Sequence, residues 1–286
     1  MSGSEPNINW YPGHMKKAAR MIEDNLRLVD AVVEIRDARI PESSRNPDVD
    51  KLTGSKPRLV ILNRADQADA AATALWRRKL EGEGHTVLET DCRSGKGVSA
   101  FPAAARRQLR EQIERNEAKG QGGKPLRFMV LGIPNVGKSS FINRLAGRRA
   151  AEAGDRPGVT RGRQWIHVNG GVQLLDTPGI LWPKLDTPAI GLALAWTGAV
   201  NDEILDRELV ASRLLERLQE LYPQALRERY KLPLEGGNSG YELLQQAARK
   251  RGFLIAGGET DTERMARVLL DEFRGGRLGR ITLERP

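Results

Sequence analysis

The chain has 286 residues and a formal net charge of +9. This length predicts about two domains, each large enough for a core of its own. Its single cysteine excludes a disulfide framework and any clustered-thiol zinc or iron–sulfur site. The longest apolar stretch, 189–200, is too short to cross a bilayer, and the N-terminus has the pattern of neither a signal peptide nor a presequence. We therefore expect a cytoplasmic protein with no membrane partner, whose positive charge favours a polyanion unless it reflects codon bias alone.

Short β-rich runs alternate with amphipathic helical patterns through the first 200 residues or so. Such alternation predicts an α/β fold with a six-stranded, mostly parallel sheet covered by helices on both faces. A glycine-rich connector is expected over 116–125. The expected strands are 30–35, 58–62, 85–88, 128–131, 164–168 and 172–175, and the expected helices between them are 14–29, 69–82, 98–117 and 138–147.

The strand signal stops after about residue 200, and leucines recur near helical spacing from Leu205 to Leu221. Two further helices are expected at 239–250 and 261–274, each ending at glycine. We therefore predict an α/β domain over residues 1–203 and an all-helical domain over residues 204–286.

Gly132-Ile-Pro-Asn-Val-Gly-Lys-Ser139 lies between an expected strand and an expected helix and matches the phosphate-loop pattern. In such a loop, main-chain N–H groups hold phosphate oxygens at a helix N-terminus. Lys138 would reach the β- and γ-phosphates as a catalytic residue, and the Ser139 hydroxyl would bind Mg²⁺. The alternative is a glycine-rich turn without a ligand. The nucleotide contacts expected here are Pro134, Asn135, Val136, Gly137, Lys138, Ser139 and Ser140.

Asp176-Thr-Pro-Gly179 follows the last expected strand. By itself this sequence is an ordinary β-turn. Together with a phosphate loop it predicts that Asp176 holds Mg²⁺ and that the Gly179 N–H contacts the γ-phosphate. Thr160, in the turn-rich loop between the two motifs, is the expected second hydroxyl ligand of Mg²⁺.

Asn63-Arg-Ala-Asp66 lies upstream of the phosphate loop and is similar to the Asn-Lys-x-Asp element of GTP-binding proteins. The Asp66 carboxylate would accept hydrogen bonds from guanine N1–H and the exocyclic amine, whereas adenine would leave it unpaired. Arg64 stands where lysine is usual, and its long side chain can still cover the base and ribose. Asp91, Cys92 and Arg93 stand at the usual Ser-Ala-Lys position and would act through main-chain N–H groups.

The order of these motifs is base reader, 91–93 loop, phosphate loop, Thr160 loop and Asp-Thr-Pro-Gly. This is a circular permutation of the order in Ras-like GTPases. Trp10-Tyr-Pro-Gly-His-Met15 and Asp37-Ala-Arg-Ile-Pro41 accompany it. With these segments, nearly the whole chain resembles the RbgA/YlqF ribosome-biogenesis GTPases of the permuted YlqF/YawG group.

This resemblance implies a circularly permuted P-loop GTPase domain followed by a helical, RNA-binding C-terminal domain. It implies hydrolysis of GTP to GDP and phosphate with Mg²⁺, slow in the free protein and stimulated by the ribosomal particle. It further implies a role in late assembly of the large (50S) ribosomal subunit, with 23S-type rRNA or pre-50S particles as partners. We expect a monomer.

The residue that orients the attacking water is not given by the Asp-x-x-Gly element, because Ile180 stands where Ras-like enzymes have glutamine. The resemblance implies a catalytic histidine in the Trp-Tyr-Pro-Gly-His-Met element, and His14 is that residue. A helix N-terminus, where His14 is expected, favours the neutral imidazole. The alternative is a helix-start residue or an RNA contact.

Two further interpretations stay open. In GTPases with a similar phosphate loop, an asparagine at the place of Asn135 helps to bind K⁺, and the alternative is a loop-stabilising hydrogen bond. Arginines crowd the Thr160 loop and would either dock on rRNA or lie in solvent; they are Arg148, Arg149, Arg156, Arg161 and Arg163. The alternative functions are a GTPase acting on another RNA, such as in tRNA modification, and a metabolic P-loop NTPase.

Overall fold

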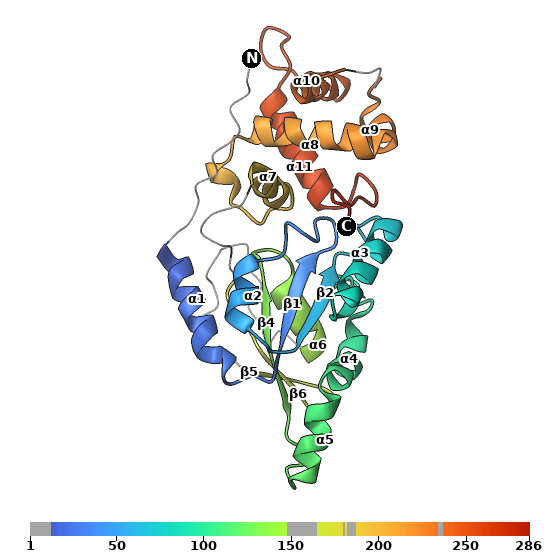
Figure 1. The fold of residues 1–286 in the computed structure, drawn as a ribbon. Coiled ribbons are helices and arrows are strands. Elements are labelled where there is room, and N and C mark those ends of the chain that lie inside the picture. The colour runs from blue at the N-terminus through green and yellow to red at the C-terminus, as the bar shows by residue number, and fades with distance from the viewer. Residues whose placement is uncertain (1–12, 148–164, 180, 182–186, 234–236) are drawn as a thin grey trace. The chain divides into compact units, whose positions relative to one another are not determined.

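The computed structural model describes residues 13–147, 165–179, 181, 187–233 and 237–286, and for 13–19 the backbone alone. The chain divides into two units, which are described separately below (Figure 1). One unit contains the sheet, the helices up to residue 146 and the last residues Glu284–Pro286. The other contains the helices from residue 188 to residue 274.

Six strands form one sheet in the order β3-β2-β1-β4-β6-β5, and every neighbouring pair is parallel except β5 with β6. The predicted six-stranded, mostly parallel sheet is confirmed. Asp37 at the end of β1 lies opposite Asn63 at the end of β2, and Gly132 at the end of β4 lies opposite Ile35. The carboxyl ends of the three central strands therefore meet at one edge, where open α/β sheets bind ligands. The strands are β1 (Ala31–Asp37), β2 (Arg58–Asn63), β3 (Thr86–Thr90), β4 (Leu126–Gly132), β5 (Trp165–Val168) and β6 (Val172–Leu175).

The expected helices of this unit are present, with two differences. The 98–117 pattern is broken at Leu109 (φ −106°, ψ 20°), which is buried although no residue of the following helix is. A seven-residue helix over Pro47–Thr53, absent from the sequence-based expectation, begins at Asn46, whose side chain accepts a hydrogen bond from the Asp48 N–H. The helices are α1 (Gly13–Leu26), α2 (Pro47–Thr53), α3 (Ala70–Gly82), α4 (Phe101–Gln108), α5 (Arg110–Ala118) and α6 (Lys138–Ala146).

Helices cover both faces of the sheet (Figure 1). On one face, Ile22 and Leu26 of α1 form a buried cluster with Val32, Met129 and Leu175. On the other, Phe101 of α4 packs edge-on against Phe128 of β4 and Phe141 of α6, with ring centroids 5.7 and 5.3 Å apart. Burial on both faces explains why these strands read as nearly continuous apolar runs.

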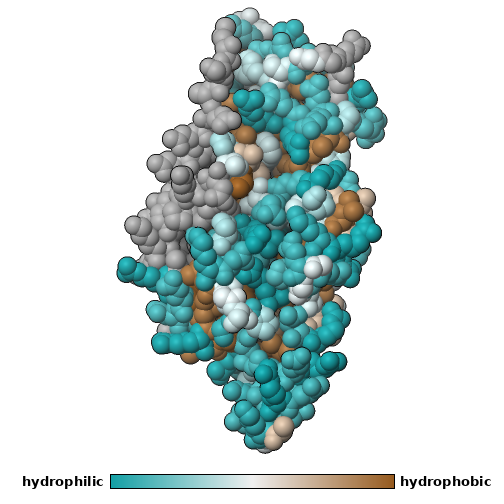
Figure 2. Space-filling model, viewed as in Figure 1, coloured by the Kyte–Doolittle hydropathy of each residue, from teal (hydrophilic) through white to brown (hydrophobic). Residues whose placement is uncertain are grey.

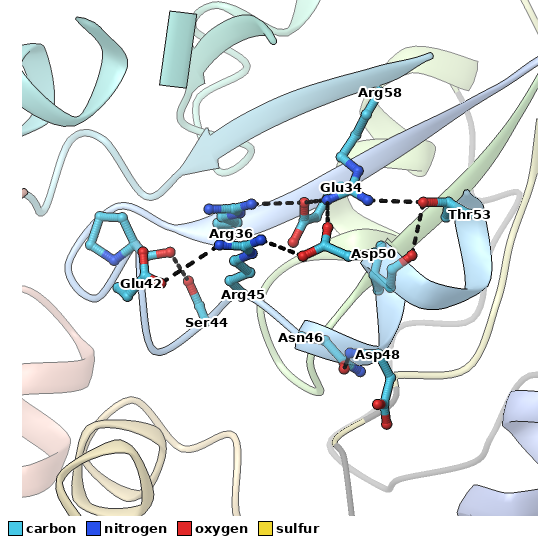
Figure 3. Close-up of polar contacts among 12 residues, drawn as sticks. Glu34, Arg36, Glu42, Ser44, Arg45, Asn46, Asp48, Asp50, Thr53 and Arg58 are labelled. Atoms are coloured by element: carbon cyan, nitrogen blue, oxygen red, sulfur yellow. Dashed lines mark hydrogen bonds and ion pairs between the residues drawn. The ribbon is translucent and has the colours of Figure 1, made fainter. Parts of the chain in front are cut away.

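On the face of the sheet that α1 covers, a network of polar side chains lies among the apolar ones and holds α2 against the sheet (Figure 3). Glu34 of β1 is 1% exposed and accepts hydrogen bonds from Arg36 (3.0 Å) and Arg58 (3.2 Å). Arg58 also pairs with Asp50 and donates to the Thr53 hydroxyl (2.8 Å), both on α2. Because these charges are paired across three elements, the cost of their burial is partly compensated and α2 is fixed to β1 and β2.

The helical unit comprises α7 (Pro188–Trp196), α8 (Arg207–Leu221), α9 (Pro223–Tyr230), α10 (Gly240–Lys250) and α11 (Thr262–Arg274). The structure places α7 in this unit, whereas the sequence predicts a boundary at residue 203. The reason is packing: the Trp196 indole N–H donates to the Val210 carbonyl of α8 (2.9 Å), and Arg274 of α11 donates to the Ala195 carbonyl (2.8 Å). The first part of the apolar stretch, 189–196, is therefore a helix whose last four residues are buried.

The view in Figure 2 shows a mostly hydrophilic surface on which hydrophobic residues are scattered. Among the described residues, no helix is long and apolar enough to span a membrane.

The last residues of the chain return to the sheet unit. The Glu284 carboxylate accepts hydrogen bonds from the main-chain N–H groups of Glu42 (2.7 Å) and Ser43 (3.1 Å). The Trp76 indole of α3 donates to the Glu284 carbonyl (3.3 Å). The loop that follows β1 is thus held by the C-terminal residues.

Candidate nucleotide-binding site

The phosphate loop runs from the end of β4 to the start of α6, as the sequence predicts. A Cβ on Gly132 would lie 2.6 Å from the Ile35 carbonyl oxygen. At Gly137, φ is +104° and a Cβ would lie 2.3 Å from the Asn63 side-chain nitrogen. Only glycine fits at either place, and the resulting loop brings main-chain N–H groups to the N-terminus of α6.

Lys138, the first residue of α6, is 7% exposed. Its ammonium group donates to the carbonyl oxygens of Gly132 (3.1 Å) and Ile133 (2.9 Å). Burial lowers the pKa of Lys138 to about 8, and the nearby Asp176 carboxylate opposes this shift. The lysine is thus held beneath the loop, where anionic phosphate would stabilise its charged form.

The Asp176–Gly179 segment lies against the phosphate loop. A Cβ on Gly179 would lie 2.8 Å from the Pro134 Cα and 2.9 Å from the Lys138 Nζ. The Thr177 hydroxyl, 1% exposed, donates to the Val130 carbonyl of β4 (2.5 Å) and so fixes the turn. The structure brings these two motifs together, as expected from their sequence. The role of Thr177 was not foreseen, because a threonine in Asp-Thr-Pro-Gly reads as a turn residue.

Asp176 has the chemistry that a magnesium ligand requires, and the role of Ser139 stays a prediction. Asp176 is 4% exposed, and its Oδ1 atom has no hydrogen-bond partner within the described part of the chain. Burial raises the pKa of this carboxyl group, and Lys138 only partly opposes that effect. Mg²⁺ in phosphate sites takes one or two protein ligands, the rest being phosphate and water. A buried carboxylate oxygen without a partner is the donor such an ion requires.

Asn63 connects the base reader to the phosphate loop. Its side-chain nitrogen donates to the Val136 carbonyl (2.8 Å). Its side-chain oxygen accepts from the Thr90 hydroxyl (3.1 Å) and the Cys92 N–H (3.2 Å). One buried amide therefore joins the ends of β2 and β3 to the phosphate loop, although these segments lie far apart in the sequence.

Asn63→Ala is expected to lower the free energy of unfolding by about 2–3 kcal/mol, because it removes three hydrogen bonds between buried groups. The Thr90 hydroxyl would keep only its contact with the Cys92 sulfur. Urea unfolding monitored by far-UV circular dichroism checks this value. A variant as stable as the wild type would contradict the assignment of Asn63 as the connecting residue.

Arg64 spans from the end of β2 to the phosphate loop. It has φ +60°, and its Nη2 donates to the Asn135 carbonyl (2.8 Å). Asn135 also lies in the left-handed region, with φ +56°. Two residues further along, Asp66 is exposed. The structure thus brings the expected base reader beside the expected phosphate loop and leaves the Asp66 carboxylate open to solvent.

The 91–93 loop lies next to the base reader, but its main-chain donors are used within the protein. The Cys92 N–H donates to Asn63, and the Arg93 N–H donates to the Asp91 carboxylate (2.8 Å). Arg144 of α6 donates to the Arg93 carbonyl. These bonds order the loop itself, so its role toward the base stays a prediction.

The Cys92 thiol is expected to react slowly in the folded protein. Burial raises its pKa to about 11, and the side chain is 7% exposed. At pH 8 only about one thiol in a thousand would be ionised, and the thiolate is the reactive form. Alkylation followed by mass spectrometry should be about 100-fold slower in the native protein than in urea. Equal rates would show that the 91–93 loop is open.

Comparison with known proteins places the chain in a family. Residues 127–217 match the family described as 50S ribosome-binding GTPase. The chain is 44% identical to ribosome biogenesis GTPase A of Bacillus cereus over 279 residues, which is 98% of this chain and 94% of that protein. The chain belongs to the ribosome biogenesis GTPase A family. The family protein of Thermotoga maritima is 34% identical over 280 residues, covering 98% of this chain and 95% of that one.

Solved structures of this family have the same permuted fold. The GDP-bound structure titled TM YlqF superposes with a TM-score of 0.69 at 30% identity, covering 93% of this chain and 99% of that one. YlqF from T. maritima with bound GNP gives a TM-score of 0.65 at 30% identity, covering 94% and 98%. The circularly permuted GTPase fold predicted from the motif order is therefore confirmed.

Several predicted residues lie outside the described part of this ribosome biogenesis GTPase A family member. They are Thr160, Ile180, the arginines of the Thr160 loop and the side chain of His14, whose backbone begins α1.

Proposed function

We propose that this protein hydrolyses GTP to GDP and phosphate and acts in late assembly of the large ribosomal subunit, binding pre-50S particles or 23S-type rRNA in one nucleotide state. The observation that carries the nucleotide part is the junction at Asn63 and Arg64, which joins a guanine-type base reader to a phosphate loop. Labelled GDP should be displaced by unlabelled GTP but not by ATP. Displacement by ATP would favour a metabolic P-loop NTPase instead.

Each motif has its own part in the reaction. The loop N–H groups and Lys138 bind the β- and γ-phosphates and offset the charge that develops during transfer. Ser139, Asp176 and Thr160 would hold Mg²⁺, which would supply further charge neutralisation at the phosphates. The Gly179 N–H contacts the γ-phosphate. Asp66 accepts from the guanine edge, and the 91–93 loop borders the base.

His14 is the residue we assign to orient the attacking water, because Ile180 offers neither a donor nor an acceptor. His14→Ala should leave GTP binding intact and reduce ribosome-stimulated turnover by about 10–100-fold, the range for a positioned acid–base group. Single-turnover phosphate release measures this effect. Unchanged turnover would reject the role.

Asn135 is assigned to a K⁺ ion that adds positive charge at the phosphates. Its left-handed backbone (φ +56°) and exposed side chain are compatible with this role. GTP hydrolysis should then be faster in KCl than in NaCl at equal ionic strength. Equal rates would leave Asn135 as a loop-stabilising residue.

The ribosomal partner is supported by the names of the relatives, which are ribosome biogenesis GTPases. From a role on assembling ribosomes we infer that the protein acts in the cytoplasm, and we expect a monomer. Sedimentation with purified large subunits tests the partner: the chain should pellet with a non-hydrolysable GTP analogue and stay in the supernatant with GDP. Equal pelleting in both states, or binding to tRNA rather than to subunits, would overturn the proposal.

A further inference from the structure

Asp37, the last residue of β1, lies beside the base reader. It is 2% exposed and in register with Asn63 on the neighbouring strand. Its carboxylate accepts three hydrogen bonds from Arg39: from the main-chain N–H (3.0 Å), from Nε (2.9 Å) and from Nη2 (2.7 Å). Burial alone would raise the pKa of Asp37, but the Arg39 and Arg64 charges outweigh it and hold that pKa low. The group is therefore a fixed buried anion.

Arg64 is the second arginine beside this anion. Its Nε lies 3.7 Å from Asp37 Oδ2, while its Nη2 donates to the Asn135 carbonyl of the phosphate loop. A planar guanidinium can face two acceptors at once, whereas a lysine ammonium is a single point charge. One side chain thus links the end of β1 to the phosphate loop, at the position where lysine is usual in GTP-binding proteins.

The backbone around Asp37 is held in place. Its N–H donates to the Ser44 hydroxyl (3.0 Å), which in turn donates to the Ile40 carbonyl (2.7 Å). The next residue, Arg45, pairs with Asp50 of α2, so the loop after β1 is tied to the polar network of Figure 3. Because the loop is anchored, the Asp37 carboxylate offers Arg64 a stationary partner rather than an adaptable one.

We propose that Asp37 is a positioning residue for guanine-nucleotide binding: paired with Arg39, it holds the Arg64 guanidinium between the base reader and the phosphate loop. The inference rests on the guanine-nucleotide site proposed above. It adds to that site a carboxylate from outside the base-reading and phosphate-binding motifs. It also explains how an arginine serves where lysine is usual.

A double-mutant cycle tests the inference, using binding of fluorescently labelled GDP and steady-state hydrolysis of GTP. Asp37→Asn should weaken GDP binding by about 10-fold and raise the KM for GTP by a similar factor, with kcat unchanged. Arg64→Ala should weaken binding at least as much. In the Arg64→Ala background, Asp37→Asn should have no further effect, because its action passes through Arg64.

Glu34→Gln is the matched control. Glu34 lies on the same strand, is equally buried and is also paired with arginines. Its ion pairs within the described part of the chain are with Arg36 and Arg58, which belong to neither the base reader nor the phosphate loop. This variant should lose stability in thermal unfolding and keep the wild-type affinity for GDP. A 10-fold loss of GDP affinity in Glu34→Gln would overturn the inference, because general loosening of β1 would then explain the Asp37 effect.

Two further results would also overturn it. Arg64 is partly exposed, with 26% of its side chain accessible, so Arg64→Ala should fold even if Asp37→Asn does not. If Arg64→Ala kept the wild-type affinity for GDP, Arg64 could not be the residue through which Asp37 acts. An equal loss of GDP affinity from Asp37→Asn in the wild-type and Arg64→Ala backgrounds would show that Asp37 does not act through Arg64. Failure of the wild-type protein to bind GDP would instead reject the proposed function itself.

Discussion

Asp66→Asn is expected to weaken GDP binding by about 100-fold or more and to make the protein bind xanthosine diphosphate. Guanine presents two donors, N1–H and the exocyclic amine, to the carboxylate. Xanthine presents N1–H and a carbonyl oxygen, which match the carboxamide oxygen and NH₂ group of asparagine. The Asp66 side chain is exposed at the surface, so the change should alter recognition of the base without disturbing the core.

Asp69→Asn is the control for this exchange. Asp69 lies three residues further along and caps α3 by accepting from the Ala72 N–H (3.0 Å), and asparagine caps helices equally well. Calorimetric titration of both variants with GDP and with xanthosine diphosphate separates the two roles. Loss of GDP affinity in Asp69→Asn, or tight GDP binding by Asp66→Asn, would show that Asp66 does not read the base.

Lys138→Ala should reduce the affinity for GTP by about 1,000-fold, since it removes charge-assisted hydrogen bonds to the β- and γ-phosphates. GDP has no γ-phosphate, so it loses only the bond to its β-phosphate and should be affected less. The lysine is buried at the loop, and its bonds to the Gly132 and Ile133 carbonyls are modest beside those to an anion. The variant should therefore unfold near the wild-type temperature without nucleotide and show no rise in that temperature when a non-hydrolysable GTP analogue is added.

Lys119→Ala, at the exposed end of α5, should behave as the wild type in the same thermal measurements. A nucleotide-dependent rise in melting temperature that persists in Lys138→Ala would mean that the phosphates bind elsewhere.

Much of the fold and of the candidate site could be predicted from local sequence patterns. The six strands follow from apolar runs that are buried on both faces, and the phosphate loop follows from glycines that the structure requires at Gly132 and Gly137. The base reader was identifiable because Asn63 and Asp66 stand at a fixed spacing after a strand. These features depend on residues close together in the sequence, which a local pattern can report.

Features that depend on long-range partners could not be predicted. The break at Leu109 arises where burial against the sheet ends, and α7 belongs with the helical unit because Trp196 and Arg274 bond there. Asp50 of α2 pairs with Arg58 of β2, which also pairs with Glu34 of β1, and such long-range partners cannot be read from the composition of α2. Asp37 appeared only as part of a family motif. Its proximity to Arg64 required the parallel register of β1 with β2.

The permuted order has a structural consequence at this junction. The base reader precedes the phosphate loop by about 70 residues, as the separation between Arg64 and Asn135 shows. The two motifs are nevertheless joined by the Asn63 amide and the Arg64 guanidinium. A nucleotide bound here would therefore contact both halves of the sheet at once, which couples its affinity to the integrity of both.

GTP hydrolysis by the full chain, titrated with purified large ribosomal subunits, tests the proposed function most directly. The free protein should hydrolyse GTP slowly, and the rate should rise with subunit concentration to a plateau that Lys138→Ala does not reach. A rate that stays the same at saturating subunits, or that Lys138→Ala reproduces, would contradict the account.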